Sequence, residues 1–161
     1  MATPALAEKV RITPGTADQL DSVMTVMDAA FGDQFGEAWT RSQLSGILPM
    51  AGVFLILAID RGTDLVVGFS LFRTVIDESE LLLIAVLPGE QRRGVGSLLL
   101  EDFLDRARAD RASRVHLEVR DGNPAIGMYH AAGFSAVGRR RNYYHATSGK
   151  RYDAITLAYE L

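Results

Sequence analysis

Apolar residues recur along this chain in two patterns: helical spacings of three and four, and short runs or alternations typical of strands. The helical spacings predict helices over 16–31, 40–47, 97–109 and 123–132. The runs and alternations predict strands over 10–12, 53–59, 65–75, 81–86, 114–120, 134–140 and 154–159. Residues 1–8 are expected to form a loose tail, and 142–153 is expected to be a polar loop.

The connections between these segments predict how the strands pair. Short polar turns, such as 60–64, join three successive strands, which indicates an antiparallel meander. The strand–helix–strand order around 97–109 indicates one parallel pairing in an otherwise antiparallel set. The expected fold class is therefore α/β (α+β by segregation criteria), with a mixed, mostly antiparallel sheet flanked by helices. With no repeat or linker, residues 1–161 are expected to form one domain with its core in 10–161.

Composition narrows the possible functions. A hydrophobic content of 48% over 161 residues argues against disorder, and a net charge of −3 argues against a broad nucleic-acid footprint. The absence of cysteine excludes disulfides and thiolate metal sites, and the three histidines lack metal-ligand spacing, so no metal is expected. The N-terminus lacks the apolar core of a signal peptide, and the apolar runs are too short to cross a bilayer. We therefore expect a cytoplasmic protein with no membrane partner, and we predict no particular oligomeric state.

The segment 91–97, QRRGVGS, joins an apolar strand to a helix. Two closely spaced glycines allow the backbone to curl so that successive N–H groups point one way, and the positive end of the helix dipole lies behind them. These features predict a socket for phosphate oxygens. No Lys follows the glycines as in a nucleotide-hydrolase loop, and Leu99 stands where the dinucleotide fingerprint needs its third glycine. The alternative is an ordinary helix start with a solvated arginine pair.

The motif QRRGVG resembles the Q/R-x-x-G-x-G/A loop of the GNAT acetyltransferases, which holds the pyrophosphate of acetyl-coenzyme A. Three later stretches also match: LEVR at 117–120, AIGMYHAAGF at 125–134 and RNYYHATSGKRYDAITL at 141–157. Together they are similar to the branch that acetylates N-terminal α-amines, most of all to the bacterial ribosomal-protein-alanine N-acetyltransferases. The resemblance implies a GNAT fold with splayed central strands, acetyl-CoA as cosubstrate, and a protein or peptide N-terminus as acceptor, with the N-terminal alanine of ribosomal protein S18 as the expected one.

The resemblance also implies which residues line the site. The acetyl-CoA contacts that it implies are Ile84, Ala85, Val86, Gln91, Arg92, Arg93, Gly94, Val95, Gly96, Ser97 and Asn123. The acceptor-binding residues that we expect are Phe35, Glu37, Tyr143 and Tyr144. In the family pattern the asparagine stands seven residues before the helix tyrosine, whereas Asn123 stands six before Tyr129. Either the helix begins one residue late, or Asn123 is displaced from its usual cofactor contact.

Acetyl transfer from a thioester to an amine needs a neutral amine, a donor to the carbonyl oxygen and a proton for the departing thiolate. A peptide α-amine has a pKa of about 7.7–8.0 against about 10.4 for lysine, which makes its deprotonation easier by about 3 kcal/mol, so a modest base suffices. The resemblance assigns this role to Glu118, acting through a water. It also implies Tyr129 as the acid and a backbone N–H near Val86 as the carbonyl donor.

Each of these residues has an ordinary structural interpretation as well. Glu118 could be a solvated strand carboxylate paired with Arg120 or Arg114, and Tyr129 could simply pack beneath the sheet. The basic run 139–141 could attract acidic peptides or form a solvated strand end. At the level of the whole protein, two alternatives stay open: a GNAT enzyme acting on a small-molecule amine, and a non-catalytic acyl-CoA sensor.

Overall fold

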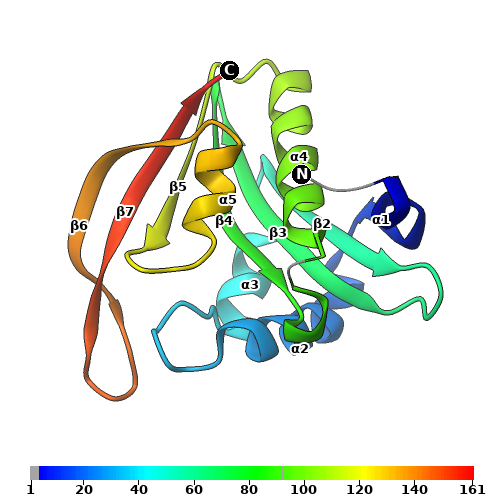
Figure 1. Cartoon of the computed structure of the whole chain (residues 1–161), viewed down its shortest axis with the longest axis horizontal. Helices are drawn as coiled ribbons and strands as arrows, with labels where there is room; N and C mark the ends of the chain where they lie inside the picture. The colour runs from blue at the N-terminus through cyan, green and yellow to red at the C-terminus, as the bar shows by residue number, and fades with distance from the viewer. Residues whose placement is uncertain (1–3, 92) are drawn as a thin grey trace.

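A seven-stranded sheet forms the centre of the computed structural model, which describes residues 4–91 and 93–161 (Figure 1). The strands are β1 (Val10–Pro14), β2 (Val53–Asp60), β3 (Val66–Val75), β4 (Glu78–Val86), β5 (Arg114–Arg120), β6 (Ser135–His145) and β7 (Arg151–Glu160). The helices are α1 (Pro4–Lys9), α2 (Leu20–Phe31), α3 (Arg41–Ile47), α4 (Val95–Ala109) and α5 (Ile126–Ala131), with 3-10 turns η1 (Ala17–Gln19) and η2 (Pro88–Glu90). The strand order is β1-β2-β3-β4-β5-β7-β6.

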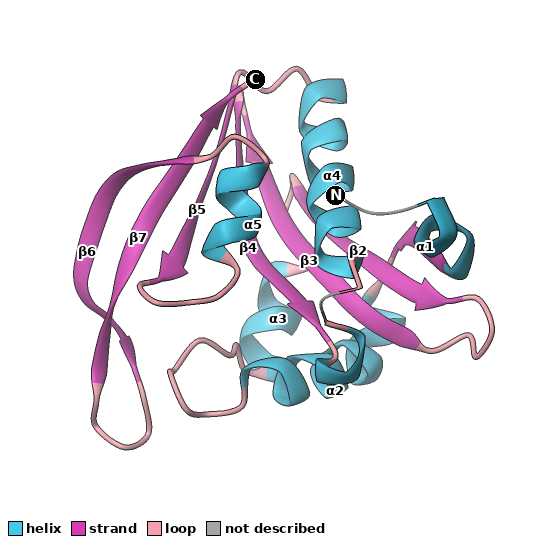
Figure 2. Ribbon diagram, in the orientation of Figure 1, coloured by secondary structure: helices cyan, strands magenta, loops and turns pink. Residues whose placement is uncertain are grey.

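The helices cover two opposite faces of this sheet. Because successive strand side chains point to opposite faces, Leu55 and Leu57 of β2 belong to the apolar layer with α2 and α3, whereas Ile56 and Ala58 belong to the layer that contains α4 and α5. Figure 2 shows α4 and α5 in front of the strands, with α3 behind them. The sheet is thus buried between two apolar layers over its central strands, which confirms the mixed fold expected from the sequence.

Strands β4 and β5 form the only parallel pair within the described residues, and they pair over a short stretch. Their register joins Glu78–Leu81 to Arg114–Leu117, while β4 continues to Val86 and β5 to Arg120. A bulge lies where the pairing ends, because Leu81 and Leu83 oppose consecutive residues of β3 and Leu82 is left over. Such an extra residue bends its strand, so β4 turns away from β5 (Figure 1). This divergence confirms the expected splay of the central strands.

Two helix starts follow from capping boxes that the sequence contains. The Thr16 hydroxyl accepts from the backbone N–H of Asp18, and Gln19 reaches back to the N–H of Thr16, so η1 leads directly into α2. The same arrangement joins Thr40 to Gln43 at the start of α3. The Thr40 cap directly follows the segment 32–39, which carries two of the expected acceptor residues.

The expected loose tail at 1–8 is wrong for its described part, because residues from Pro4 to Lys9 form helix α1. The side chain of Leu6 is buried against the apolar layer that contains α4. A helix this short has too few turns to show periodicity, and it depends on that tertiary contact.

The expected polar loop at 142–153 is also wrong over most of its length. Strand β6 continues to His145 and β7 begins at Arg151, with Tyr144 opposite Tyr152 at the end of the hairpin. The side chains of β6 are nearly all exposed at the edge of the sheet. Residues 142–153 lie outside both apolar layers, so the sequence carries no apolar alternation there.

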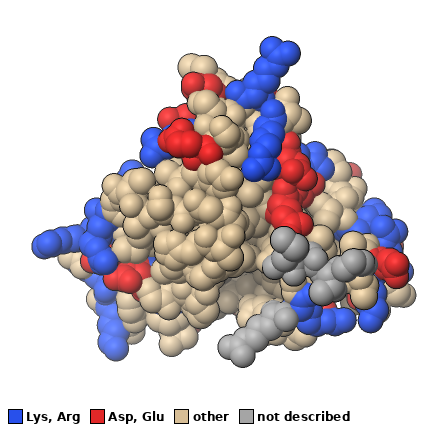
Figure 3. Space-filling view, turned by 45° about the horizontal axis from the view of Figure 1, so that its top comes forward, with Lys and Arg blue, Asp and Glu red and all other residues tan. Residues whose placement is uncertain are grey.

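Charge and hydropathy fit this layered structure. On the face in Figure 3, positively and negatively charged side chains gather around a broad area without charged residues. None of the helices within the described residues combines the length and the hydropathy that crossing a bilayer would need.

Candidate active site

Glu118 lies on β5 just beyond the point where β4 departs, on the sheet face opposite α4. Its side chain is only 14% exposed. The hydroxyl of Thr156, directly opposite on β7, donates to Oε2 at 2.8 Å, and Nε of Arg140 lies 2.9 Å from Oε1. The carboxylate is therefore held by two partners from later strands. The expected alternative pairings are wrong, since Arg120 pairs with Glu37 and Arg114 with Glu160.

Tyr129 comes from α5 on the other side of the divergence. Its side chain is buried, and its ring packs edge-on against Phe134 at 5.9 Å between centroids. Burial, with smaller contributions from Tyr144 and the charge of Glu37, raises the pKa of Tyr129 well above its ordinary value. The phenol therefore keeps its proton at neutral pH. Among the described residues its hydroxyl has no hydrogen-bond partner, which leaves that proton available to a bound group.

Tyr143 and Tyr144 lie near the end of β6, with their rings perpendicular and 5.0 Å apart. The hydroxyl of Tyr144 donates to the backbone carbonyl of Glu118 at 3.4 Å, so this ring lies beside the carboxylate strand. Burial, followed by the charge of Glu37, raises the pKa of Tyr144. Tyr143 is exposed, and the Arg140 guanidinium lies 5.5 Å from its ring centre. The structure thus brings Tyr129, Tyr144 and Glu37 into one electrostatic neighbourhood.

Phe35 and Glu37 are engaged by the protein itself. The two Glu37 carboxylate oxygens accept from Nε of Arg120 at 3.2 Å and from the Asn123 amide at 3.0 Å. Phe35 lies under the Arg120 guanidinium, 3.6 Å from its central carbon, and packs edge-on against Tyr152. The Asn123 side chain is engaged at both ends, because its carbonyl oxygen also accepts from the backbone N–H of Ala125 at 2.8 Å. Helix α5 begins only after this turn, at Ile126.

The glycine-punctuated turn ends in a helix N-terminus without a side-chain cap. Gly94 takes a left-handed conformation, with φ of +92°, which a residue with a Cβ rarely adopts, and α4 starts directly after it. Leu98 donates the first intrahelical bond, to Gly94, so the N–H groups of Val95, Gly96 and Ser97 have no acceptor in the helix. These three amides and the helix dipole form a site for an anion.

Other residues of the turn are partly occupied. The Gln91 amide donates to the Val86 carbonyl at 3.1 Å, and Arg93 pairs with Glu90 at 2.8 Å. Arg92, also expected to contact acetyl-CoA, lies outside the described residues. Ile84 and Ala85 pair with β3 on one side, and their other edge faces the gap left by β5.

The residues present fit acetyl-CoA on structural grounds. The free amides of α4 suit its diphosphate, and the unpaired edge of β4 supplies backbone groups that an extended amide arm can pair with, as a strand would. Gly96 faces Met128 of α5, and an added Cβ would lie 3.2 Å from the Met128 sulfur. The two helices therefore pack closely where the turn meets the divergence.

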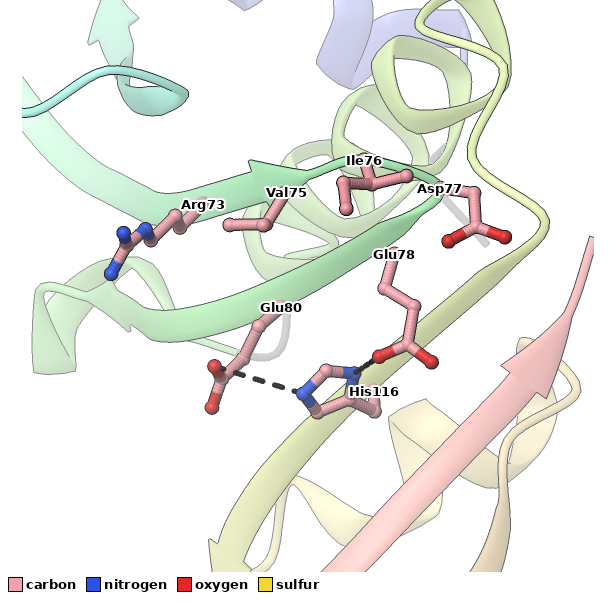
Figure 4. A pocket seen from close by; sticks show the side chains of 7 residues that line it. All are labelled: Arg73, Val75, Ile76, Asp77, Glu78, Glu80 and His116. Atoms are coloured by element: carbon pink, nitrogen blue, oxygen red, sulfur yellow. Dashed lines mark ion pairs between the residues drawn. The ribbon is translucent and has the colours of Figure 1, made fainter.

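A pocket of about 350 Å³ opens on the Glu118 face of the sheet, near the β3–β4 turn (Figure 4). His116, two residues before Glu118 on β5, points between Glu78 and Glu80, whose carboxylates lie 3.8 and 3.7 Å from its ring nitrogens. The Glu80 carboxylate raises the pKa of His116, and in return the His116 ring lowers the pKa of Glu80. This cluster continues the polar row of β5 away from the divergence.

The remaining candidate residues have structural partners. His130 and His145 bind backbone carbonyls, at 3.0 and 2.9 Å. Within the described residues no group of three or more His, Asp or Glu side chains could hold a metal ion. In the basic run, Arg139 bridges Asp121 and Asp153, both at 2.8 Å, so this arginine closes the β6–β7 edge rather than facing solvent alone.

Thr156 is the site residue that the sequence does not reveal. Its position opposite Glu118 depends on the register of β5 against β7, which no local pattern records. Tyr152, which packs against Phe35, depends in the same way on the β6–β7 hairpin. Arg140 was visible only as part of a charged run.

A mixed sheet with one diverging parallel pair and a glycine turn at a helix start that leaves three amides without an acceptor in the helix is the arrangement expected of an acyl-CoA-dependent acyltransferase. The family model described as "Acetyltransferase (GNAT) family" matches residues 20–134, and the chain belongs to this family. The resemblance drawn from the sequence is confirmed at this level.

Particular relatives narrow the comparison. The chain is 39% identical over 93 residues to the ribosomal protein bS18-alanine N-acetyltransferase of Haemophilus influenzae, a match that covers 58% of this chain and 64% of the relative. It is 42% identical over 92 residues to the same-named enzyme of Escherichia coli K12, covering 56% and 62%. The matched segment thus spans just under two thirds of the length of each of these relatives. The crystal structure of the ribosomal-protein-S18-alanine N-acetyltransferase from Escherichia coli superposes with a TM-score of 0.84 at 29% identity, covering 94% of this chain and 93% of that one.

Proposed function

We propose that residues 1–161 act as a single N-acetyltransferase domain that transfers the acetyl group of acetyl-CoA to the N-terminal α-amine of a protein. The observation that carries this proposal is the divergence of β4 from β5, with free amides of α4 at one end and the Glu118 carboxylate beyond it. Tyr129 is buried on α5, where Tyr144 and Glu37 act on it electrostatically. A pure acyl-CoA sensor would need neither of these two side chains.

The acetyl group arrives as a thioester, whose carbonyl carbon is attacked by the neutral amine while the carbon–sulfur bond breaks. Glu118 takes the amine proton through a water, and the hydroxyl of Thr156 keeps one carboxylate oxygen fixed meanwhile. Tyr129 gives its proton to the departing thiolate, for which a phenol that stays protonated in the resting enzyme is suited. The N–H groups along the free edge of β4 near Val86 are the proposed donors to the carbonyl oxygen.

The acceptor that we propose is a protein beginning with alanine, and specifically ribosomal protein S18. The support is the activity for which the relatives in Haemophilus influenzae and Escherichia coli are named, together with the agreement of fold over nearly the whole chain. The loop that carries Phe35 and the ring of Tyr144 both lie on one side of Glu118. On this side the N-terminus of the acceptor protein would approach.

The test is a steady-state assay with acetyl-CoA and a peptide that begins with alanine and contains an internal lysine. We expect one acetyl group per peptide, on the α-amine, and no product from the same peptide with a blocked N-terminus. A panel of polyamines and aminoglycosides serves as the comparison. A higher kcat/KM with any of these amines, or acetyl-CoA binding without turnover of any acceptor, would overturn the proposal.

A further inference from the structure

Arg120, the last residue of β5, forms an ion pair that is almost fully buried. The side chains of Arg120 and Glu37 are 9% and 11% exposed, and 3.2 Å separates Nε from Oε1. These residues are 83 positions apart in the chain, so the contact fixes the loop between α2 and α3 to the end of the strand that carries Glu118. Replacing one residue of such an ion pair by a neutral residue leaves the other charge buried and unpaired.

The guanidinium plane has further partners that only arginine can satisfy. It lies over the ring of Phe35 at 3.6 Å and near that of Tyr152 at 5.9 Å, and it donates to the backbone carbonyl of Asp121 at 3.3 Å. A lysine ammonium would keep the charge but would lose the planar stack and the directed fork. Arg120 thus joins the loop, the β6–β7 hairpin and the β5–α5 turn.

The same loop is held from a second direction by its backbone. Gly36 has φ of +72°, and a Cβ on it would overlap the carbonyl oxygen of His145 at the end of β6. The Thr147 hydroxyl adds a weak bond to Asp33 at 3.5 Å. The loop therefore lies against the hairpin that carries Tyr144, and the two segments together border the Glu118 side of the sheet (Figure 1).

We infer that Arg120 is a positioning residue for the acceptor: through Glu37 and Phe35 it holds the 33–37 loop as a fixed wall of the acceptor site. This inference rests on the proposed function. Glu37 then supports the loop rather than contacting the acceptor, because both of its carboxylate oxygens accept hydrogen bonds from Arg120 and Asn123. The anion site on α4 shares none of these contacts, so loss of Arg120 should weaken acceptor binding much more than acetyl-CoA binding.

The test compares wild type with Arg120→Lys and Phe35→Leu, and uses Arg151→Lys, an exposed arginine on the same hairpin, as the matched control. Steady-state kinetics on the alanine-starting peptide are combined with hydrogen exchange of the loop amides. For Arg120→Lys and Phe35→Leu we expect the peptide KM to rise about tenfold, with kcat and the acetyl-CoA KM within about twofold of wild type. Loop amides 33–37 should exchange at least tenfold faster, and Arg151→Lys should behave as wild type.

Two results would overturn the inference: an unchanged peptide KM in both variants, or an acetyl-CoA KM that rises as much as the peptide KM. Phe35→Leu leaves no buried charge unpaired. It therefore still tests the role of the loop if Arg120→Lys fails to fold. Wild-type turnover of the peptide tests the proposed function separately. If wild type is active and the variants match it, only the role of Arg120 fails.

Discussion

Arg140 reaches across β7 and brings its Nε atom within 2.9 Å of the Glu118 carboxylate, although the two residues lie on strands that are not neighbours. On the intervening strand, Ala154 lies opposite Arg140 and Thr156 lies opposite Glu118. Arg140 itself is 62% exposed, so the pair is open to water on one side. The Glu118 carboxylate is therefore paired with an arginine that water can reach.

Replacement of Glu118 by Gln tests the base directly. Gln keeps the shape and the contact with Thr156 but cannot take a proton, so we expect kcat/KM for the alanine-starting peptide to fall about 10²–10⁴-fold. Glu160→Gln is the control, since Glu160 pairs with Arg114 at the far end of the same sheet and should leave the rate unchanged. Equal rates for Glu118→Gln and wild type would remove Glu118 from the mechanism.

Tyr129→Phe tests the acid. Tyr129 and Tyr159 both pack edge-on against Phe134, at 5.9 and 5.8 Å, so Tyr159→Phe is a matched control for loss of a hydroxyl beside the same ring. We expect kcat to fall about 10²–10⁴-fold in Tyr129→Phe and to stay at the wild-type value in Tyr159→Phe. Steady-state kinetics at saturating acetyl-CoA provide the measurement. A similar loss in both variants would indicate packing rather than proton transfer.

Local patterns were sufficient to predict the central elements of this fold. The alternation over Arg114–Arg120 matches β5 without error, and the apolar stripe with its flanking glycines located α4 to within two residues. Each of these elements buries at least one face, so apolar residues recur in its sequence at the spacing of a strand or a helix. The strands over 134–140 and 154–159 were predicted as well, but the end of the hairpin between them is mostly exposed and polar, so its sequence predicts a loop over 142–153.

The contacts within the candidate site were beyond prediction from sequence. Glu118, Thr156 and Arg140 meet because β5, β7 and β6 pair in one register, and Glu37 meets Arg120 across 83 residues. A shift of one residue would send each of these side chains to the other face, and only tertiary packing fixes that choice. The family resemblance therefore named Glu118 and Tyr129 but not the residues that hold Glu118 in place.

Ser70 and Ser79 form a natural pair for testing the cost of an unpaired hydroxyl. Both side chains are fully buried, yet the Ser70 hydroxyl has no partner within the described part of the chain, whereas Ser79 bonds Thr74 at 2.9 Å. We expect Ser70→Ala to raise the free energy of unfolding by about 1 kcal/mol and Ser79→Ala to lower it by about 1 kcal/mol. Urea unfolding measures both. Destabilisation by Ser70→Ala would show that this hydroxyl is satisfied in solution.

The cluster of His116 and Glu80 predicts a pH-dependent contribution to stability (Figure 4). The folded pKa of His116 is raised above 6.5 by the Glu80 carboxylate, so its contribution is present below pH 6.5 and is lost as pH rises through the folded value. The folded pKa of Glu80 is lowered below 4.5, so its contribution is present above pH 4.5 and is lost as pH falls through the folded value.

The pair therefore stabilises the fold most between pH 4.5 and 6.5. We expect His116→Gln to cost about 0.2–1 kcal/mol at pH 5.5, a modest value because both side chains are partly exposed, and less at pH 8.5. Urea unfolding of wild type and variant at the two pH values provides the comparison. The same cost at both would mean that the ion pair contributes nothing.

Gly36→Ala tests two effects at this position: the cost of a Cβ at positive φ, and the overlap of that Cβ with the backbone of His145. A residue with a Cβ at positive φ costs about 1–3 kcal/mol by itself, and Gly149→Ala, at φ of +89° with open space around it, measures that cost alone. At Gly36 the added methyl group must also displace the backbone of His145, so we expect a clearly larger loss of unfolding free energy and a raised peptide KM. Gly149→Ala should leave the peptide KM unchanged. If the two variants lose equal stability and bind the peptide alike, the loop moves freely against the hairpin and does not wall the acceptor site.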